Sequence, residues 1–369
     1  MNCRELAGFL KENAARIPSL PIVTGFDGFV DEMISVVDQR HSLTEYDRIE
    51  TIEAFGSKIS AAAGHSSLRE IVVNQVDPGG CAINMGDGLV HFGLPVTTFA
   101  TVGEPMHPAF ADYASKAHLI SWGAEPGKTL AYEFADGKLM FSSVIPLQRF
   151  HPEQLKAYLK DGVFASACEA AKLIAITDWT LYPHMTACWQ FLVDTVFSQL
   201  SHRPAFFFDL VDPSSRSDAD IVAMLSVLKR FTECGEVTLG LNQNEANILS
   251  RLTDCVTSSA TTPELALLQG QELRAQLGVD SVVIHSIKYA IAVAADEAVS
   301  VFGPYCEKPV KSTGAGDRFN AGYVLGHVLE STMRDRLTLA CASSGYFVRT
   351  GQSVTLEQLA EFLETWMSS

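Results

Sequence analysis

The chain has 369 residues, of which 47% are hydrophobic and 19% are charged, so it can bury a large core. This composition excludes an intrinsically disordered protein. The formal net charge of −16 argues against a general affinity for nucleic acid or an anionic membrane, because both are negatively charged. A small-molecule partner fits this balance better.

The N-terminal stretch, residues 1–23, mixes acidic and basic side chains and predicts a surface helix instead of a secretion signal. No run of about 18 uncharged apolar residues occurs, so no membrane-spanning helix is predicted. The eight cysteines form no CxxC pair and no short spacing to histidine, a pattern typical of separate thiols in a reducing compartment. We therefore expect a cytoplasmic protein.

Short apolar segments rich in β-formers alternate with helical patterns along the chain. The predicted strands are 20–26, 96–103, 172–179, 205–212, 237–242 and 280–286, and helical patterns lie at 152–164, 218–231 and 262–278. Because parallel strands need crossover connections, this alternation predicts a doubly wound, mostly parallel sheet flanked by helices. We expect a single α/β domain over residues 1–369.

Three segments interrupt the alternation and predict a second, small β-sheet. Residues 32–40, 69–77 and 129–144 are strand-like, and no helices between them would cover both faces of a sheet. The third segment contains Ala135, Asp136 and Gly137, which form a hairpin turn signal. We expect a lid over the main domain, although an ordinary β-extension or a dimer contact would give the same pattern.

A glycine pair, Gly79 and Gly80, lies in the motif GGCAIN and allows a ligand to approach the backbone closely. Asn84 follows four residues after Gly80, and its amide can donate to and accept from a sugar hydroxyl.

Asn242 and Glu245 come at the end of the strand predicted at 237–242, where open α/β sheets bind ligands. The carboxylate of Glu245 suits Mg²⁺, which takes few protein ligands. A helix-capping acid is the alternative for Glu245.

The segment KSTGAGDRFNAGYVLG, residues 311–326, predicts a glycine-rich turn followed by a helix. The backbone N–H groups of Gly314, Ala315 and Gly316 can bind an anion at the helix N-terminus. Asp317 is either the N-cap of this helix or a general base beside a phosphoryl acceptor. Arg318 either reaches a phosphate or faces solvent.

Taken in chain order, these motifs resemble those of the ribokinase (PfkB) family of sugar and nucleoside kinases. The matching segments span nearly the whole chain: Gly25 to Asp31, GGCAIN, DPSSR at 212–216, NQNE and STGAGD. The resemblance implies a ribokinase-like fold and an ATP-dependent, Mg²⁺-requiring kinase that phosphorylates a hydroxyl of a small carbohydrate or related polyol. A nucleoside acceptor is a variant of the same activity.

The resemblance also implies roles for individual residues. The backbone of 314–316 would form the anion hole, and Asp317 would take the proton from the attacking hydroxyl. The sugar would be bound under the lid by Asp31, or by its competitor Asp27, together with Gly79, Gly80 and Asn84. The nucleotide and Mg²⁺ would be bound by Asn242, Glu245, Thr313 and Lys311, with Glu245 contacting the metal directly or through water. Lids in this family often meet across a homodimer.

The last motif departs from the usual family form, because Lys311 and Ser312 stand where relatives have Asp-Thr. In relatives that acid helps to shape a monovalent-cation site beside the anion hole. We hypothesise that the Lys311 ammonium replaces the potassium ion, so that a monovalent cation is not required. A solvated surface lysine is the alternative.

A second departure lies in residues 282–293, where relatives usually carry Thr-x-Gly-x-x-Gly. His285, Ile287 and Ala290 replace the threonine and both glycines, and their larger side chains would crowd the nucleotide. This departure supports an alternative function, a catalytically weak family member that acts as a sugar- or nucleotide-binding sensor.

Overall fold

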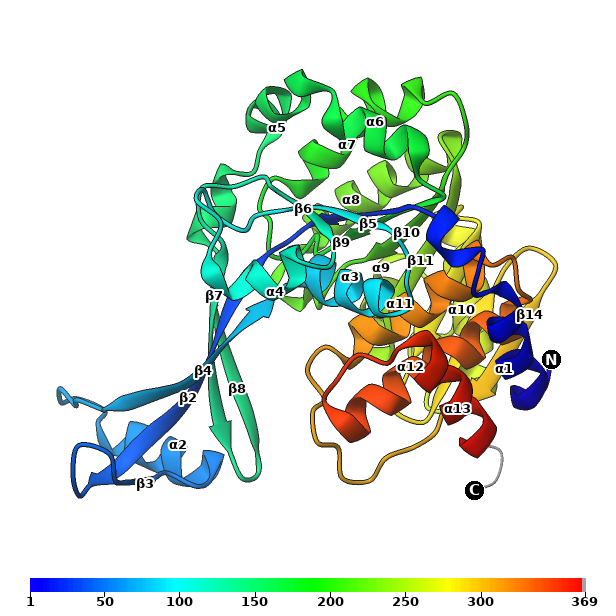
Figure 1. The fold of residues 1–369 in the computed structure, drawn as a ribbon. Helices are drawn as coiled ribbons and strands as arrows, with labels where there is room; N and C mark the ends of the chain where they lie inside the picture. The colour runs from blue at the N-terminus through cyan, green and yellow to red at the C-terminus, as the bar shows by residue number, and fades with distance from the viewer. Residues whose placement is uncertain (367–369) are drawn as a thin grey trace.

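The computed structural model describes residues 1–366, and within them the chain forms a nine-stranded main sheet (Figure 1). Its order is β14-β13-β12-β11-β10-β9-β1-β5-β6, parallel from β6 to β12 and antiparallel at β13 and β14. The strands are β1 (Ile22–Phe26), β5 (Val96–Ala100), β6 (His118–Ser121), β9 (Leu173–Thr177), β10 (Ala205–Asp209), β11 (Glu236–Asn242), β12 (Ser281–His285), β13 (Tyr289–Val293) and β14 (Ala298–Phe302). All six strands predicted for this sheet are confirmed.

Helices cover both faces of the main sheet, as predicted. One face carries α1 (Cys3–Asn13), α3 (Cys81–His91), α11 (Ala315–Val328), α12 (Met333–Thr350) and α13 (Leu356–Trp366). The other carries α5 (Pro152–Tyr158), α6 (Val163–Ala170), α7 (Met185–Thr195), α8 (Asp218–Arg230), α9 (Gln243–Leu252) and α10 (Pro263–Leu277). Each central strand is therefore buried on both sides: in β9, Leu173 packs toward the first set and Ile174 toward the second.

Several elements of the structure differ from the predictions or were not predicted. The helix predicted over 152–164 is two helices, because Gly162 takes a left-handed conformation with φ 71° and separates α5 from α6. The segment 41–68, for which no element was predicted, contains β3 (Tyr46–Arg48) and α2 (Ile52–Ala61). The short α4 (Ala111–Ala114) was also not predicted.

The predicted small sheet is present and extends away from the main sheet as an arm (Figure 1). Its order is β3-β2-β7-β8, with β4 paired to the other side of β2; the strands are β2 (Phe29–Arg40), β4 (Ile71–Gly79), β7 (Gly127–Phe134) and β8 (Gly137–Ser143). Helix α2 packs on this sheet through Phe55, whose ring lies 5.4 Å from that of Phe134. We call this five-stranded unit with α2 the lid, after the role predicted for it.

The order of the main sheet places a topological switch at β1. The chain runs from β1 to β5 and β6 on one side, and then returns to β9 on the other side of β1. In open α/β sheets the crevice at the carboxyl end of such a switch is where ligands bind. The lid strand β2 starts at Phe29, three residues after β1 ends, so the lid lies at this same edge.

The N-terminal segment forms the predicted surface helix. Helix α1 begins after a capping box made by Asn2 and Glu5, and it packs against α13. All eight cysteines are unpaired. Within residues 1–366, no helix has both the length and the apolar content needed to cross a membrane.

Helices α11 and α12 approach each other closely at Gly322. A Cβ atom at this position would lie 2.6 Å from the Leu339 carbonyl oxygen and 2.8 Å from the Ala340 Cα. Both neighbours are backbone atoms of α12, so neither can move without displacing that helix. Since α11 begins with the predicted anion-binding turn, this contact fixes the helix that carries it.

We predict that Gly322→Ala lowers the free energy of unfolding by about 1–3 kcal/mol, because the added methyl group overpacks the α11–α12 contact. Gly8→Ala in α1 is the matched control. Its Cβ would meet nothing within 4 Å, so the better helix propensity of alanine should stabilise by up to about 1 kcal/mol. Urea denaturation measures both, and a Gly322→Ala variant as stable as the wild type would contradict the prediction.

Candidate active site

The predicted anion-binding turn lies at the N-terminus of α11, with Gly314 as the N-cap residue. Gly314 has φ 87°, a left-handed conformation that favours glycine. The N–H of Ala315 donates to the Ser312 carbonyl oxygen at 3.1 Å. The N–H groups of Gly316 and Asp317 have no partner within residues 1–366, so they remain available to an anion together with the positive end of the helix dipole.

Asp317 lies in the first turn of α11 and is only 7% exposed. The N-cap alternative is wrong, because Gly314 occupies that position. Burial and then the charge of Asp209 raise the pKa of Asp317 to about 7, although Arg318 opposes the shift. A carboxyl group with this pKa beside free N–H groups can act as a general base near neutral pH.

Further carboxyl groups gather at the carboxyl edge of the main sheet. Asp27 follows β1, Asp178 follows β9, Asp209 ends β10, and Glu245 lies in the first turn of α9 after β11. Asp27, Asp178 and Glu245 are buried and Asp209 is half-buried, and loss of solvent is the main cause that raises the pKa of each. Sequence reasoning missed Asp178 and Asp209; the signal that would have found them is an acid at the end of each predicted strand.

Asp27 holds the N-terminus of α3. Its carboxylate accepts hydrogen bonds from the N–H groups of Cys81 and Ala82, and from the Thr177 hydroxyl at 2.7 Å. The N-cap residue of α3 is Gly80, which has no side chain to cap the helix, so Asp27 performs that role from the end of β1.

Asp31 lies within the lid strand β2, which begins at Phe29 and not at residue 32 as predicted. Its side chain is half-buried, and burial raises its pKa while a hydrogen bond from Thr129 opposes this. A Cβ atom at Gly79 would collide with the Asp31 carboxylate, so a larger residue at this position would displace that side chain. Asp31 and the glycine pair thus lie together at the base of the lid.

Two motifs far apart in the sequence meet at the anion-binding turn. Asn84 lies in α3, one turn after Gly80, and its Nδ2 atom would be 3.8 Å from a Cβ atom at Gly314. The Asn84 amide has no hydrogen-bond partner among the described residues, which leaves both its donor and its acceptor atoms for a ligand. The structure therefore brings Asn84, which is predicted to bind the sugar, close to the turn that is predicted to bind the phosphoryl group.

Asn242 and Glu245 form a capping box at the start of α9. The Glu245 carboxylate accepts from the Asn242 backbone N–H at 2.8 Å and from its Nδ2 at 2.7 Å. The capping alternative for Glu245 is thus correct. No group of three or more His, Cys, Asp or Glu side chains in residues 1–366 is arranged to hold a metal ion by itself.

Lys311 and Thr313 lie in the loop before the anion-binding turn. The Lys311 ammonium is 3.7 Å from the carboxylate of Asp77, which belongs to the lid strand β4, and the side chain is 41% exposed. Lys311 therefore connects this loop to the lid. Thr313 is half-buried in the same loop.

Arg216, in the predicted Asp-x-x-x-Arg segment, lies near the same edge of the sheet. Its guanidinium lies over the ring of Trp179 at 4.3 Å and donates to the carbonyl oxygens of Thr180 and Tyr182. These contacts hold the loop that follows β9, which contains the buried Asp178.

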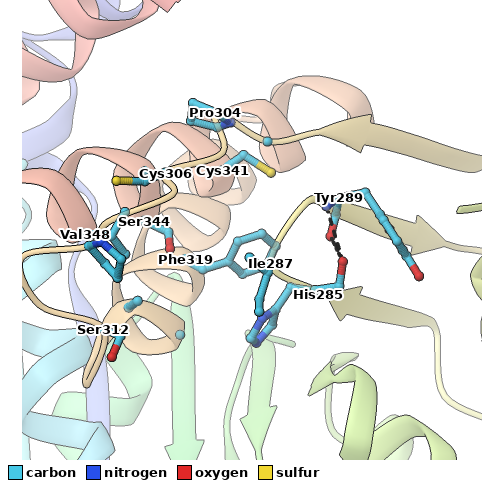
Figure 2. A pocket seen from close by; sticks show the side chains of 16 residues that line it. His285, Ile287, Tyr289, Pro304, Cys306, Ser312, Phe319, Cys341, Ser344 and Val348 are labelled. Carbon is cyan, nitrogen blue, oxygen red and sulfur yellow. Dashed lines mark hydrogen bonds between the residues drawn. The ribbon is translucent and has the colours of Figure 1, made fainter. Parts of the chain in front are cut away.

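A cavity of about 300 Å³ lies beside the anion-binding turn (Figure 2). It is mostly apolar and is lined by the β12–β13 turn, the loop after β14, α11 and α12, including His285, Ile287, Gly303, Pro304, Cys306, Ser312, Gly316, Phe319, Cys341, Ser344 and Val348. Its size is at the lower end of that of ligand pockets, and Gly316 connects it to the anion-binding turn.

The substitutions predicted to crowd this cavity do so only in part. His285 and Ile287 line it, whereas Ala290 is buried in the core on β13. The His285 ring packs 4.8 Å from that of Phe319, and burial lowers its pKa to about 4, so the ring is neutral at pH 7. His285 is thus a packed, neutral side chain that lines the cavity.

Sequence comparisons match nearly the whole chain to ketohexokinases. The family model described as prokaryotic ketohexokinase matches residues 4–366. A ketohexokinase from Haloferax volcanii is 26% identical over 355 residues, which cover 95% of this chain and 93% of that protein.

Solved structures of sugar kinases share the fold. Ribokinase from Thermotoga maritima superposes with a TM-score of 0.60 at 13% identity, over 95% of this chain and 99% of that one. A variant of phosphofructokinase-2 from Escherichia coli gives a TM-score of 0.61 at 14% identity, with the same coverage of both chains. The predicted resemblance to the ribokinase family is confirmed. The chain belongs to the prokaryotic ketohexokinase family and is a carbohydrate kinase with the ribokinase-like fold.

Proposed function

We propose that this kinase transfers the terminal phosphoryl group of ATP to a hydroxyl of a ketohexose, with Mg²⁺ as the metal cofactor. The observation that carries the proposal is the buried Asp317 beside the free N–H groups of the anion-binding turn, with Asn84 next to them. The name of the Haloferax volcanii relative supports a ketohexose among the small carbohydrates and polyols that the sequence predicts.

In this mechanism Asp317 takes the proton from the sugar hydroxyl as the new phosphorus–oxygen bond forms. The bond from phosphorus to the leaving oxygen of ADP breaks in the same in-line displacement. The N–H groups of Gly316 and Asp317, with the N-terminal dipole of α11, stabilise the negative charge on the transferring group. Gly314 and Ala315 supply the turn that aims these donors.

The sugar would lie between the base of the lid and α3. Asp31 and Asn84 are the side chains with polar atoms available for its hydroxyl groups, and Gly79 and Gly80 keep the backbone open beside them. Asp27 contributes by capping α3. The contact of Lys311 with Asp77 would hold the lid toward the site, which excludes water and suppresses hydrolysis of ATP.

The nucleotide would occupy the cavity beside Gly316, next to the loop of Thr313. Mg²⁺, when bound, neutralises charge on the phosphate groups. Negative charge at this edge of the sheet favours such a cation, because four buried carboxyl groups and the half-buried Asp209 lie there. Asn242 already occupies both carboxylate oxygens of Glu245, so Glu245 would act on the metal through water.

We also propose a homodimer formed through the lid. Strand β4 lies at the edge of the lid sheet and exposes Ile71, Val73 and Val76. An exposed edge strand with apolar side chains favours pairing with a second copy.

The activity is tested by ADP release with Mg-ATP across ketohexoses, aldohexoses, pentoses, polyols and nucleosides. We expect the highest kcat/KM with a ketohexose, and a fall in kcat of roughly 10²-fold or more in Asp317→Asn, which removes the base. Asp296→Asn, an exposed acid in the β13–β14 turn, is the matched control and should keep full activity. Absence of turnover across the panel would contradict the proposal and favour the sensor alternative.

The pH profile tests the role of Asp317 as a base. Only the deprotonated carboxylate accepts a proton, and burial with the Asp209 charge raises its pKa to about 7. The value of kcat/KM should therefore fall as the pH drops through about 7. An acid limb near the ordinary aspartate range, about 4, would contradict this assignment.

The dependence on potassium tests the hypothesis for Lys311. If its ammonium replaces a free monovalent cation, turnover measured in a buffer without Na⁺ and K⁺ should stay constant when K⁺ is added. A steep rise in kcat with added K⁺ would overturn the replacement.

A further inference from the structure

Arg318 follows Asp317 in the first turn of α11 and is only 8% exposed. A buried charge is costly unless hydrogen bonds and an opposite charge compensate for it. The alternative in which Arg318 faces solvent is therefore wrong. The contacts of its buried guanidinium show which elements it connects.

The guanidinium is fixed on three sides. Nη2 donates to the Asp87 carboxylate at 2.9 Å, Nε donates to the Ser353 hydroxyl at 3.0 Å, and the group lies 4.6 Å from the ring centre of Phe347. Ser353 in turn donates to Asp87 at 2.5 Å, which closes the cluster. Burial by itself would raise the pKa of Asp87, but Arg318 and Ser353 lower it below the ordinary value. Asp87 and Arg318 therefore form an ion pair.

These partners come from elements on both sides of the proposed site. Asp87 lies in α3, one turn after Asn84, whereas Phe347 lies in α12, which lines the nucleotide cavity. Gly88 allows α3 and α11 to approach, since a Cβ atom there would lie 2.8 Å from that of Ala321. Arg318 thus connects α3, on the side proposed for the sugar, to α11 and α12, which line the cavity proposed for the nucleotide.

The remaining terminal nitrogen, Nη1, points to the anion-binding turn. It has no hydrogen-bond partner within residues 1–366, and it would lie 2.9 Å from a Cβ atom at Gly314. The Nδ2 atom of Asn84 is 3.8 Å from the same point. Arg318 also opposes the rise in the pKa of Asp317, which shows that its charge acts on the base.

We propose that Arg318 is a positioning residue for phosphoryl transfer. Its guanidinium, clamped by Asp87 and Ser353, holds the acceptor helix α3 against the turn at Gly314 and places a fixed positive charge beside Asp317. Lysine cannot replace it fully, because a single ammonium cannot bind both partners and support the turn at once. This role rests on the proposed kinase activity.

The test compares Arg318→Met, Arg318→Lys and Asp87→Asn with Arg336→Met, the matched control. Arg336 is a half-buried arginine that bonds to His327 and the Ser331 carbonyl oxygen. The kinetic constants and the pH dependence of kcat/KM are measured with Mg-ATP and the best sugar of the panel. Circular dichroism and thermal unfolding report whether each variant is folded.

We expect Arg318→Met to lower kcat by roughly 10- to 100-fold, because small misplacements of reacting groups have effects of this size. Its acid limb should move to higher pH, since loss of a positive charge favours the protonated form of Asp317. Asp317 also faces Asp27, Asp209 and the Cys81 thiol, which stay unchanged in these variants. Arg318→Lys and Asp87→Asn should lower kcat but keep the acid limb close to that of the wild type.

A folded Arg318→Met with the kcat and acid limb of the wild type would overturn this inference alone, as would equal losses of activity in Arg336→Met. If only thermal stability fell in the Arg318 and Asp87 variants, Arg318 would be a packing residue and the inference would be wrong. Absence of turnover in the wild type would overturn the proposed function and this inference with it.

Discussion

The structure depends on how buried carboxyl groups are accommodated at one edge of a parallel sheet. Asp27, Asp178 and Asp209 come directly at the ends of three neighbouring strands, and Glu245 and Asp317 add to them from helix first turns. Burial raises the pKa of every one of these groups. Such an arrangement is tolerated because hydrogen bonds satisfy several of the carboxyl groups, and it suits a reaction that brings a metal ion and a proton to the site.

The hydrogen bonds divide these acids into two kinds. Asp27 caps α3 and Glu245 caps α9, so their carboxylates hold helices in place. Asp317 makes no such cap, and the N–H groups of Gly316 and Asp317 have no partner among the described residues, which fits the proposed role of Asp317 as the base. Two helix N-termini are thus anchored by carboxylates, and that of α11 is left for the proposed phosphoryl group. The ion pair of Arg318 with Asp87 connects α11 to α3.

The sequence predicted the strands of the main sheet well, because runs such as 205–212 are continuously apolar, as both-face burial requires. It also predicted the residues of the glycine-rich turn and the lid. It placed the end of β1 correctly at residue 26, but it began the lid strand at residue 32 instead of Phe29, so it did not place Asp31 within that strand. The partners of Arg318 were equally hidden, because Asp87 lies 231 residues away and only the packing of α3 on α11 brings them together.

A crystal structure of the protein with Mg-ADP, fluoroaluminate and fructose tests most directly whether phosphoryl transfer takes place at Asp317. Fluoroaluminate should lie at the N-terminus of α11, within hydrogen-bond distance of the Gly316 and Asp317 N–H groups. A sugar hydroxyl should then lie within about 3 Å of the Asp317 carboxylate. Fluoroaluminate bound elsewhere, or a sugar with no hydroxyl near Asp317, would contradict the assignment of this site.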